Sequence, residues 1–99
     1  MIRLIIRSQT PEEVVLEVHG WVSGGNVSIL EQEGVRLLGE SGRLVLDLKG
    51  VQFIDEEGMG VLRGWVSEGV VLRGGSLFVR MLLEAHGLGS EEADGSAYE

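Results

Sequence analysis

The sequence predicts an α/β fold: a mixed β-sheet with an antiparallel N-terminal hairpin and the element order β-β-α-β-α-β-α. Three observations support this prediction. Two segments of alternating apolar and polar residues follow each other at the N-terminus, a segment apolar on both faces lies mid-chain, and three segments show helical apolar spacing. With 99 residues, 43% of them hydrophobic, the chain has the size and composition of one domain with one core.

The first two segments predict a hairpin because only a short turn separates them. In the first segment apolar residues alternate with arginines until residues 8–11 break the pattern, where Pro11 supplies a turn. The opposing faces are Ile2, Leu4 and Ile6 against Arg3 and Arg7 in the first segment, and Val14, Leu16, Val18 and Val22 against Val15, Glu17, His19 and Trp21 in the second.

The middle of the chain predicts a helix, a central strand, a second helix and a short strand. The first helix follows the loop 24–26 and ends at residues 39–42. Residues 43–48 are apolar on both faces, as in a strand covered from both sides, and this strand is expected to end at an acid, Asp47. The second helix spans 58–67, and β-branched residues predict a strand at 70–73. The apolar helix faces are Val27, Leu30, Gly34 and Leu38, and then Met59, Leu62, Trp65 and Val66.

The C-terminal part predicts one helix and a tail. Ser76 is a good N-cap for a helix over 77–86, and Gly87 suits the left-handed position that follows a helix. Residues 89–99 are acidic and contain one large apolar side chain, so we expect them to be disordered. The predicted organisation is therefore a domain over 1–88 and a disordered acidic tail over 89–99.

The charge and composition exclude several classes of function. Eight basic residues face sixteen acidic ones, for a net charge of −8, which argues against binding nucleic acid or an anionic membrane surface. No apolar stretch approaches the length of a membrane helix, and no signal peptide is evident. The absence of cysteine excludes disulfides, thiol catalysis and cysteine-ligated metals, and fits a cytoplasmic location.

The segment 44–62 is the most informative part of the chain. It reads Leu-Val-Leu-Asp-Leu-Lys-Gly-Val-Gln-Phe-Ile-Asp-Glu-Glu-Gly-Met-Gly-Val-Leu. This resembles the STAS domain family, which includes the bacterial anti-sigma factor antagonists. Their pattern is a strand, Asp-Leu-Ser, Gly-Val, an aromatic residue, Ile or Met, and then Asp-Ser-Ser-Gly-Leu-Gly. Residues 18–20 and 71–74 also resemble the family's strand ends, so the resemblance extends over about residues 12–88.

The resemblance implies a regulatory protein-binding module. In that family a kinase that is also the anti-sigma factor phosphorylates the second Ser of Asp-Ser-Ser-Gly, and the unphosphorylated form binds this partner and releases sigma factor. Asp55 matches the Asp, Glu56 the first Ser and Glu57 the phosphoacceptor. Because glutamate has no hydroxyl, phosphorylation at this position is impossible. The resemblance therefore implies a non-enzymatic module of signalling and transcription regulation, without a cofactor, that binds a kinase-type anti-sigma factor or a related protein.

The charge of Glu57 predicts a phosphomimetic role. A phosphoserine carries about −1.5 to −2 charges, and negative charge at a helix N-terminus is favoured by about 0.3–1 kcal/mol. Glu57 would thus imitate the phosphorylated state partly and permanently. Two interpretations follow: a form locked away from its kinase, or an adapter whose partner accepts an acidic loop. A simpler alternative is that Glu56 and Glu57 only cap the helix.

The predicted partner surface combines the acidic loop with one tryptophan. It consists of Asp55, Glu56, Glu57, Gly58, Met59 and Trp21, with Asp47 in a supporting role, bonded to the loop that carries Glu57. Trp21 lies on the polar face of its strand, where it suits contact with a partner or a second copy of the chain. An equally good explanation is that the first helix or the tail covers the Trp21 side chain. Trp65, in contrast, is expected in the core.

Specific residues bear on other possible functions. A structural adapter in a stressosome-like or lipid-transport assembly shares the predicted fold. The glycines at 58, 60 and 64 resemble a dinucleotide-binding fingerprint, but the adjacent carboxylates would repel phosphate, and close packing through Gly60 and Gly64 is a plainer explanation. His19 and His86 are far apart in sequence and predict no metal site. No nucleophile elbow is present, so no enzyme activity is predicted.

Overall fold

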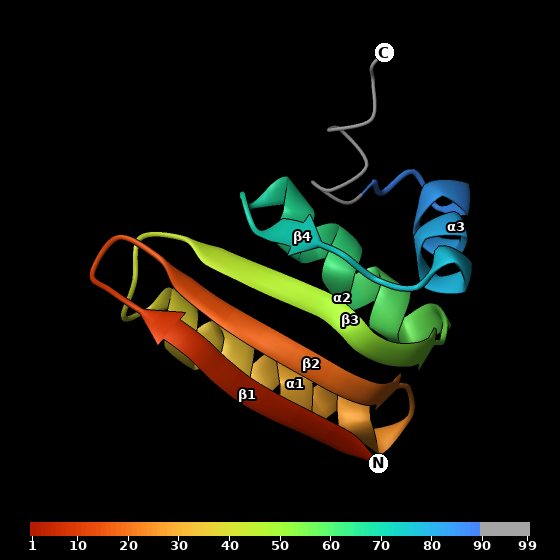
Figure 1. Cartoon of the computed structure of the whole chain (residues 1–99), viewed down its shortest axis with the longest axis horizontal. Coiled ribbons are helices and arrows are strands. Elements are labelled where there is room, and N and C mark those ends of the chain that lie inside the picture. Colours follow the sequence, from red (N-terminus) through yellow and green to blue (C-terminus); the bar gives the residue numbers. More distant parts are fainter. Residues whose placement is uncertain (90–99) are drawn as a thin grey trace.

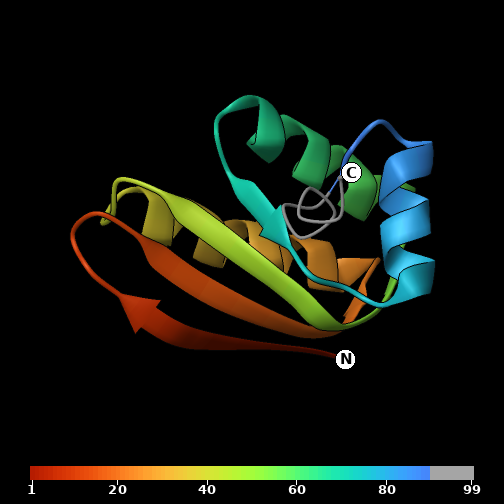
Figure 2. The same cartoon turned by 45° about the horizontal axis from the view of Figure 1, so that its top comes forward.

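The computed structural model describes residues 1–89, which form one four-stranded sheet and three helices (Figure 1). The elements are β1 (Ile2–Gln9), β2 (Val14–Val22), α1 (Gly25–Leu38), β3 (Leu44–Ile54), α2 (Glu56–Ser67), β4 (Val71–Arg73) and α3 (Leu77–Ala85). The strands lie in the order β1-β2-β3-β4. Helices α1 and α2 cover one face of the sheet, and α3 lies at its end, as Figure 2 shows from a second side. The predicted fold class and element order are confirmed.

The N-terminal hairpin is antiparallel, as predicted, but β1 is longer and less regular than expected. It pairs with β2 from Ile2 opposite Gly20 to Gln9 opposite Val14, with a bulge between Ile6 and Ser8. The expectation that Ile6 faces the core was wrong, because its side chain is 40% exposed. β1 is the edge strand and α1 packs on β2 and β3, so the helix layer does not cover this end of β1.

The central strand β3 is also longer than predicted. The expectation that it ends at Asp47 was wrong, since the strand continues to Ile54. It stays paired in parallel with β2 through two irregularities, one of which brings His19 opposite Gly50. Asp47 Oδ1 accepts a hydrogen bond from the Lys49 amide at 3.0 Å. Because seven further residues of strand span about 23 Å, Asp47 cannot bond the loop that carries Glu57.

The core lies between the sheet and the helices, and the predicted inner face of β2 is fully buried. The buried side chains of that face are Val14, Leu16, Val18 and Val22. Helix α1 buries Val27, Leu30, Gly34 and Leu37, so Leu37 takes the position predicted for Leu38, which is partly buried. Helix α2 buries Met59, Leu62 and Trp65, as predicted, whereas Val66 from the same predicted face is partly buried.

The close contact between α1 and α2 is made by a different glycine from the two predicted. A Cβ atom on Gly34 would lie 2.5 Å from Trp65 Cζ2, so α1 approaches the indole ring through the missing side chain. Gly60 and Gly64 are exposed, and a Cβ on either would meet nothing within 4 Å. The explanation of these two glycines by close packing was therefore wrong.

Helix α3 begins at the predicted residue and ends at Ala85, one residue earlier than predicted. The Ser76 hydroxyl accepts a hydrogen bond from the Val79 amide at 3.1 Å, and Gly87 has a φ of +80° after the helix end. Residues 90–99, which make up nearly all of the predicted disordered tail, lie outside the described residues. Within residues 1–89, none of the helices is both long and apolar enough to cross a membrane.

Candidate functional site

Asp55 joins the start of α2 to the loop before α1. Its Oδ1 accepts a hydrogen bond from the Gly58 amide at 2.8 Å, and its Oδ2 accepts one from the Gly24 amide at 3.0 Å. The Asp55 amide in turn donates to the Val22 carbonyl at 3.1 Å. One carboxylate therefore caps α2 and fixes the two loops that follow β2 and β3 against each other.

The same hydrogen bonds keep Asp55 ionised. The amide of Gly58 and then that of Gly24 lower the pKa of Asp55 below its ordinary value of 3.8, because both donate to the charged form. Asp55 is thus a structural carboxylate. Both of its oxygens accept backbone hydrogen bonds, and its role as a direct partner contact stays a prediction.

Glu56 and Glu57 are exposed in the first turn of α2. The helix cap is the Asp55 side chain, so the expectation that these two glutamates are the cap does not match the hydrogen bonding. Within residues 1–89, neither carboxylate forms a hydrogen bond or an ion pair. Both side chains are therefore available to a partner, and both lie where the positive end of the helix dipole favours negative charge.

Gly58 and Met59 lie beneath this acidic turn rather than on the surface. Met59 is 1% exposed, and a Cβ on Gly58 would lie 2.5 Å from the Val22 carbonyl oxygen. Of the predicted partner-binding residues, these two thus position α2 against β2 and offer little side-chain surface to another protein.

Two shallow hollows flank Glu57. One, of about 430 Å³, lies between the start of α2 and the end of α3, where Arg63 and His86 line it together with Glu57. The other, of about 490 Å³, lies along α1 and α2. His86 was predicted only as a residue near a helix C-terminus. Its place beside Glu57 depends on how α3 packs at the end of the sheet, which no local pattern indicates.

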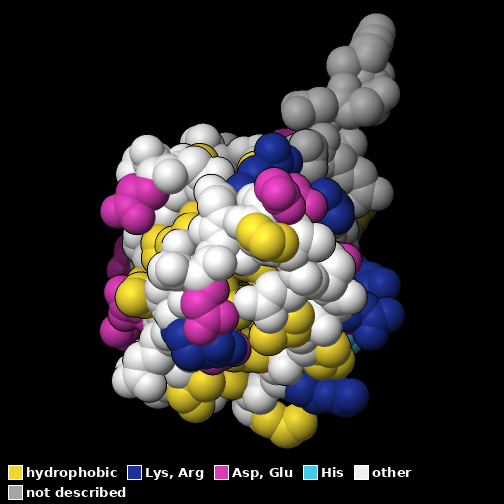
Figure 3. Space-filling view, turned by 90° about the vertical axis from the view of Figure 1, so that its left-hand side faces the viewer, with side chains coloured by type: hydrophobic (Ala, Val, Ile, Leu, Met, Phe, Trp, Pro, Cys, Tyr) yellow, Lys and Arg dark blue, Asp and Glu magenta, His cyan; other side chains and the backbone are white. Residues whose placement is uncertain are grey.

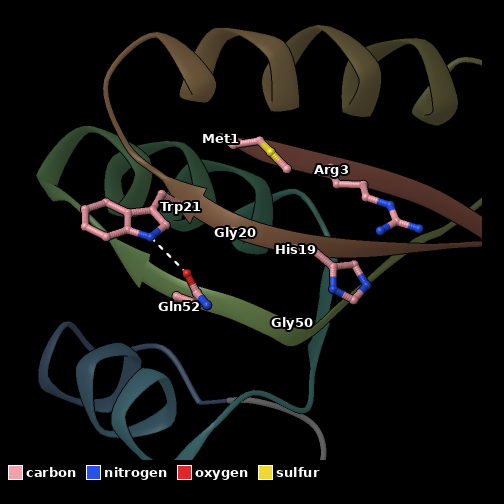
Figure 4. A pocket seen from close by; sticks show the side chains of 7 residues that line it. All are labelled: Met1, Arg3, His19, Gly20, Trp21, Gly50 and Gln52. Carbon is pink, nitrogen blue, oxygen red and sulfur yellow. Dashed lines mark hydrogen bonds between the residues drawn. The ribbon is translucent and has the colours of Figure 1, made fainter.

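Trp21 lies at the same end of the sheet but on the face turned away from α1 and α2 (Figure 4). Its side chain is 50% exposed, so neither α1 nor any other described residue covers it fully. The indole Nε1 donates to Gln52 Oε1 at 3.0 Å, and the ring lies at a tilt 5.6 Å from Phe53. The exposure fits the predicted partner contact, but the structure does not join Trp21 and Glu57 into one surface.

Glu17 is a functional candidate that the sequence did not reveal. It lies on the same outer face and is 4% exposed. Its carboxylate is 3.2 Å from Arg7 Nε, 3.2 Å from His19 Nε2 and 3.5 Å from Lys49 Nζ. An alternating strand predicts that its polar positions face water, and the gathering of three basic groups from β1, β2 and β3 becomes visible only once the strands are in register.

The far end of the molecule has a different charge pattern. Figure 3 looks at the end with the β1–β2 turn, where acidic and basic side chains lie next to each other. One such pair is Arg43 and Glu13, at 3.3 Å. The acidic start of α2 lacks such pairs among residues 1–89. Among residues 1–89, no group of three or more potential metal ligands occurs.

Comparison with known proteins identifies the family. A model of the STAS domain matches residues 5–91, and so the chain belongs to the STAS domain family. A comparison with curated proteins gave no match.

Two solved structures show the same fold. The unphosphorylated form of the anti-sigma factor antagonist SpoIIAA is 20% identical with a TM-score of 0.74, and the match covers 88% of this chain and 83% of that one. An anti-sigma factor antagonist from Mycobacterium paratuberculosis is 23% identical with a TM-score of 0.70, over 88% of this chain and 79% of that one.

Proposed function

We propose that this STAS domain is a non-catalytic docking module of the anti-sigma factor antagonist type, acting in transcription regulation in the cytoplasm. Its partner would be a kinase-type anti-sigma factor or a related protein with a basic surface. In this proposal Glu57 supplies a fixed negative charge at the position where the family carries its phosphoacceptor serine. The module would then be always in one charge state, whereas a serine-bearing relative alternates between two.

One observation supports this proposal above all: Glu57 is exposed in the first turn of α2 and is free of ion pairs within residues 1–89. Asp55 already caps the helix, so the fold has no need of Glu57 as a cap. An exposed carboxylate beside a second one, Glu56, presents the charge that an arginine or lysine of a partner would meet.

The first test measures binding. The wild-type chain and Glu57→Gln are titrated by calorimetry against a kinase-type anti-sigma factor encoded in the same genome. We expect Glu57→Gln to weaken binding by about threefold to tenfold, because a rim charge that meets a basic group is lost. The matched control, Glu12→Gln, removes one exposed charge in the β1–β2 turn and should leave the affinity unchanged.

Two results would contradict the docking role. Equal affinity of Glu57→Gln and wild type would mean that the charge is not recognised. Tighter binding by Glu57→Gln would mean that the charge repels the kinase, as a permanently phosphorylated form would do.

The second test asks whether Glu57 occupies the phosphoacceptor position. With the same kinase and MgATP, Glu57→Ser should gain one phosphoryl group by mass spectrometry, since its hydroxyl oxygen can attack the γ-phosphorus and release ADP. Glu56→Ser is the matched control, with a hydroxyl one residue earlier, and should stay unmodified. Modification of Glu56→Ser instead would show that the alignment of this segment with the family is shifted by one residue.

A further inference from the structure

A second candidate surface lies on the outer face of the sheet, away from Glu57. A hollow of about 330 Å³ opens there near the ends of β2 and β3 (Figure 4). Its floor is formed at Gly20 and Gly50, on neighbouring strands. A Cβ on Gly50 would lie 2.6 Å from two carbon atoms of the His19 ring, and one on Gly20 would overlap the Met1 carbonyl oxygen. The two missing side chains let the His19 ring lie against Gly50 and the Met1 carbonyl lie against Gly20, so both glycines shape the wall of the hollow.

The aromatic wall of this hollow is held in place before any partner arrives. Trp21 is half exposed, yet its indole nitrogen is bonded to Gln52 and its ring rests against Phe53. The backbone carbonyl of Trp21 also accepts a hydrogen bond from Asn26 Nδ2 at 3.0 Å. A fixed, exposed tryptophan loses little conformational entropy on binding, which is the property of an interface anchor.

The polar side chains of the hollow are basic or neutral. Arg3 and His19 line it, and no acidic residue does, although the chain as a whole carries a net charge of −8. Within residues 1–89 the Arg3 guanidinium forms no ion pair. His19 is oriented by its contact with the buried carboxylate of Glu17.

The basic character extends along the same face beyond the hollow. Arg7 and Lys49 are 58% and 62% exposed, and both lie against Glu17. Glu17 itself is buried beneath these cations, so Arg7 and Lys49 are the charges of this cluster that a partner can reach. This face therefore complements negative charge, whereas the start of α2 complements positive charge.

We propose that this hollow binds an acidic segment of a protein partner, with an apolar side chain on Trp21 and a neighbouring carboxylate at Arg3 and His19. The surface is separate from the acidic turn at Glu57, and its function does not depend on the charge there. A chain with both surfaces can hold two partners, or two parts of one partner, through opposite charges.

The test uses the full chain and two capped peptides, Gly-Ser-Asp-Phe-Asp-Ser-Gly and its isostere with Asn in place of both Asp. Amide and indole N–H shifts are followed by NMR during titration. We expect the acidic peptide to shift the signals of Trp21, Gly20 and Gly50 and to bind about tenfold tighter than the isostere, with an affinity that falls as salt rises. Equal binding of both peptides, no binding, or shifts confined to α2 would overturn the proposal.

Matched variants test which residues contribute to binding of the acidic peptide. Trp21→Leu should weaken binding of the acidic peptide by about tenfold, as expected for an interface anchor. Arg3→Gln should weaken the same binding by about threefold. Phe78→Leu and Arg63→Gln remove an exposed aromatic and an exposed cation on α3 and α2, and should change nothing. If these controls weaken binding as much as the two test variants do, the hollow is not the site.

Two other occupants are outcomes of the same experiment. Replacing the four acids of the tail (Glu91, Glu92, Asp94 and Glu99) by amides tests the chain's own C-terminus. Peptide binding that occurs only in this variant would assign the hollow to the tail and overturn the proposal of a partner. A dimer in sedimentation that Trp21→Leu dissociates would assign it to a second copy, with the same consequence.

Discussion

Gly34 in α1 and Trp65 in α2 form a close contact between the two helices that cover the sheet. Trp65 is 6% exposed, and a Cβ on Gly34 would lie 2.5 Å from its Cζ2 atom. The ring is rigid and enclosed, so it cannot move aside as the end of a flexible side chain would. The position of α2, and with it that of the acidic turn, therefore depends on a glycine in the other helix.

Gly34→Ala is expected to destabilise the domain. Overpacking a core costs about 1–3 kcal/mol, and better helix propensity returns at most about 1 kcal/mol. A contact this short lies at the upper end of the overpacking range, so the net loss is about 2 kcal/mol. Urea denaturation followed by circular dichroism measures it. Adding Trp65→Phe should make the double variant more stable than the sum of the single effects predicts, because the smaller ring leaves room for the methyl group.

Gly60→Ala and Gly64→Ala are the controls for this contact. Both glycines lie in α2 with open space around the would-be Cβ, so each alanine should raise the free energy of unfolding by about 0.5–1 kcal/mol through helix propensity alone. If either substitution destabilises the domain as Gly34→Ala does, glycine flexibility rather than the Trp65 contact explains the result.

Asp55 should make stability depend on pH in the acid range. Its pKa is lowered in the folded chain, first by the Gly58 amide and then by that of Gly24. Above pH 3.8, the ordinary pKa of an aspartate, the Asp55 carboxylate is charged in both the folded and the unfolded chain, and its stabilising effect is complete. The effect is lost as pH falls toward the lower pKa of the folded chain. Asp55→Asn removes the charge and one of the two acceptor oxygens, so its stability deficit should be present at neutral pH and shrink below pH 3.8 in thermal unfolding. A deficit that stays constant with pH would contradict this role.

The sequence predicts the fold well where local chemistry decides the structure. Ser76 and Gly87 mark the ends of α3 because capping and a left-handed backbone are properties of single residues. The alternation from Val14 to Val22 predicts the inner face of β2 because the side-chain period of a strand is fixed.

The predictions failed where the structure depends on pairing between distant segments. An acid at position 47 looks like the end of a strand, yet β3 continues because β2 offers partners as far as Val22 opposite Ile54. The burial of Glu17 depends on basic groups from two other strands. Gly34 was placed on the correct helix face, but its contact with Trp65 requires the packing of α1 on α2.

Ser76→Ala should destabilise the domain by about 1 kcal/mol, because the amide of Val79 loses its cap acceptor. The matched control is Ser28→Ala, at an exposed position inside α1, where alanine is the better helix former and a slight gain is expected. Both are compared by chemical denaturation. Equal effects of the two substitutions would show that the Ser76 hydroxyl is not acting as a cap.

Glu17→Gln tests the ion-pair cluster on the outer face. Burial by itself raises the pKa of Glu17, but the charges of Lys49, Arg7 and His19 outweigh it and hold the pKa below the ordinary 4.5. The stabilisation is therefore complete above pH 4.5 and is lost as pH falls toward the folded pKa. We expect the variant to be less stable than wild type at neutral pH, because three basic groups lose their buried counter-charge, and the difference to close in acid.

Denaturant unfolding across this pH range measures the effect, with Glu12→Gln as a control that removes an exposed acid and stays within about 0.5 kcal/mol of wild type. Glu17→Gln should also loosen His19, which Glu17 orients at the edge of the hollow, so the acidic peptide should bind the variant more weakly than wild type even where both are fully folded. Unchanged stability at neutral pH would mean that solvent screening at the exposed ends of Arg7 and Lys49 cancels the gain from the cluster.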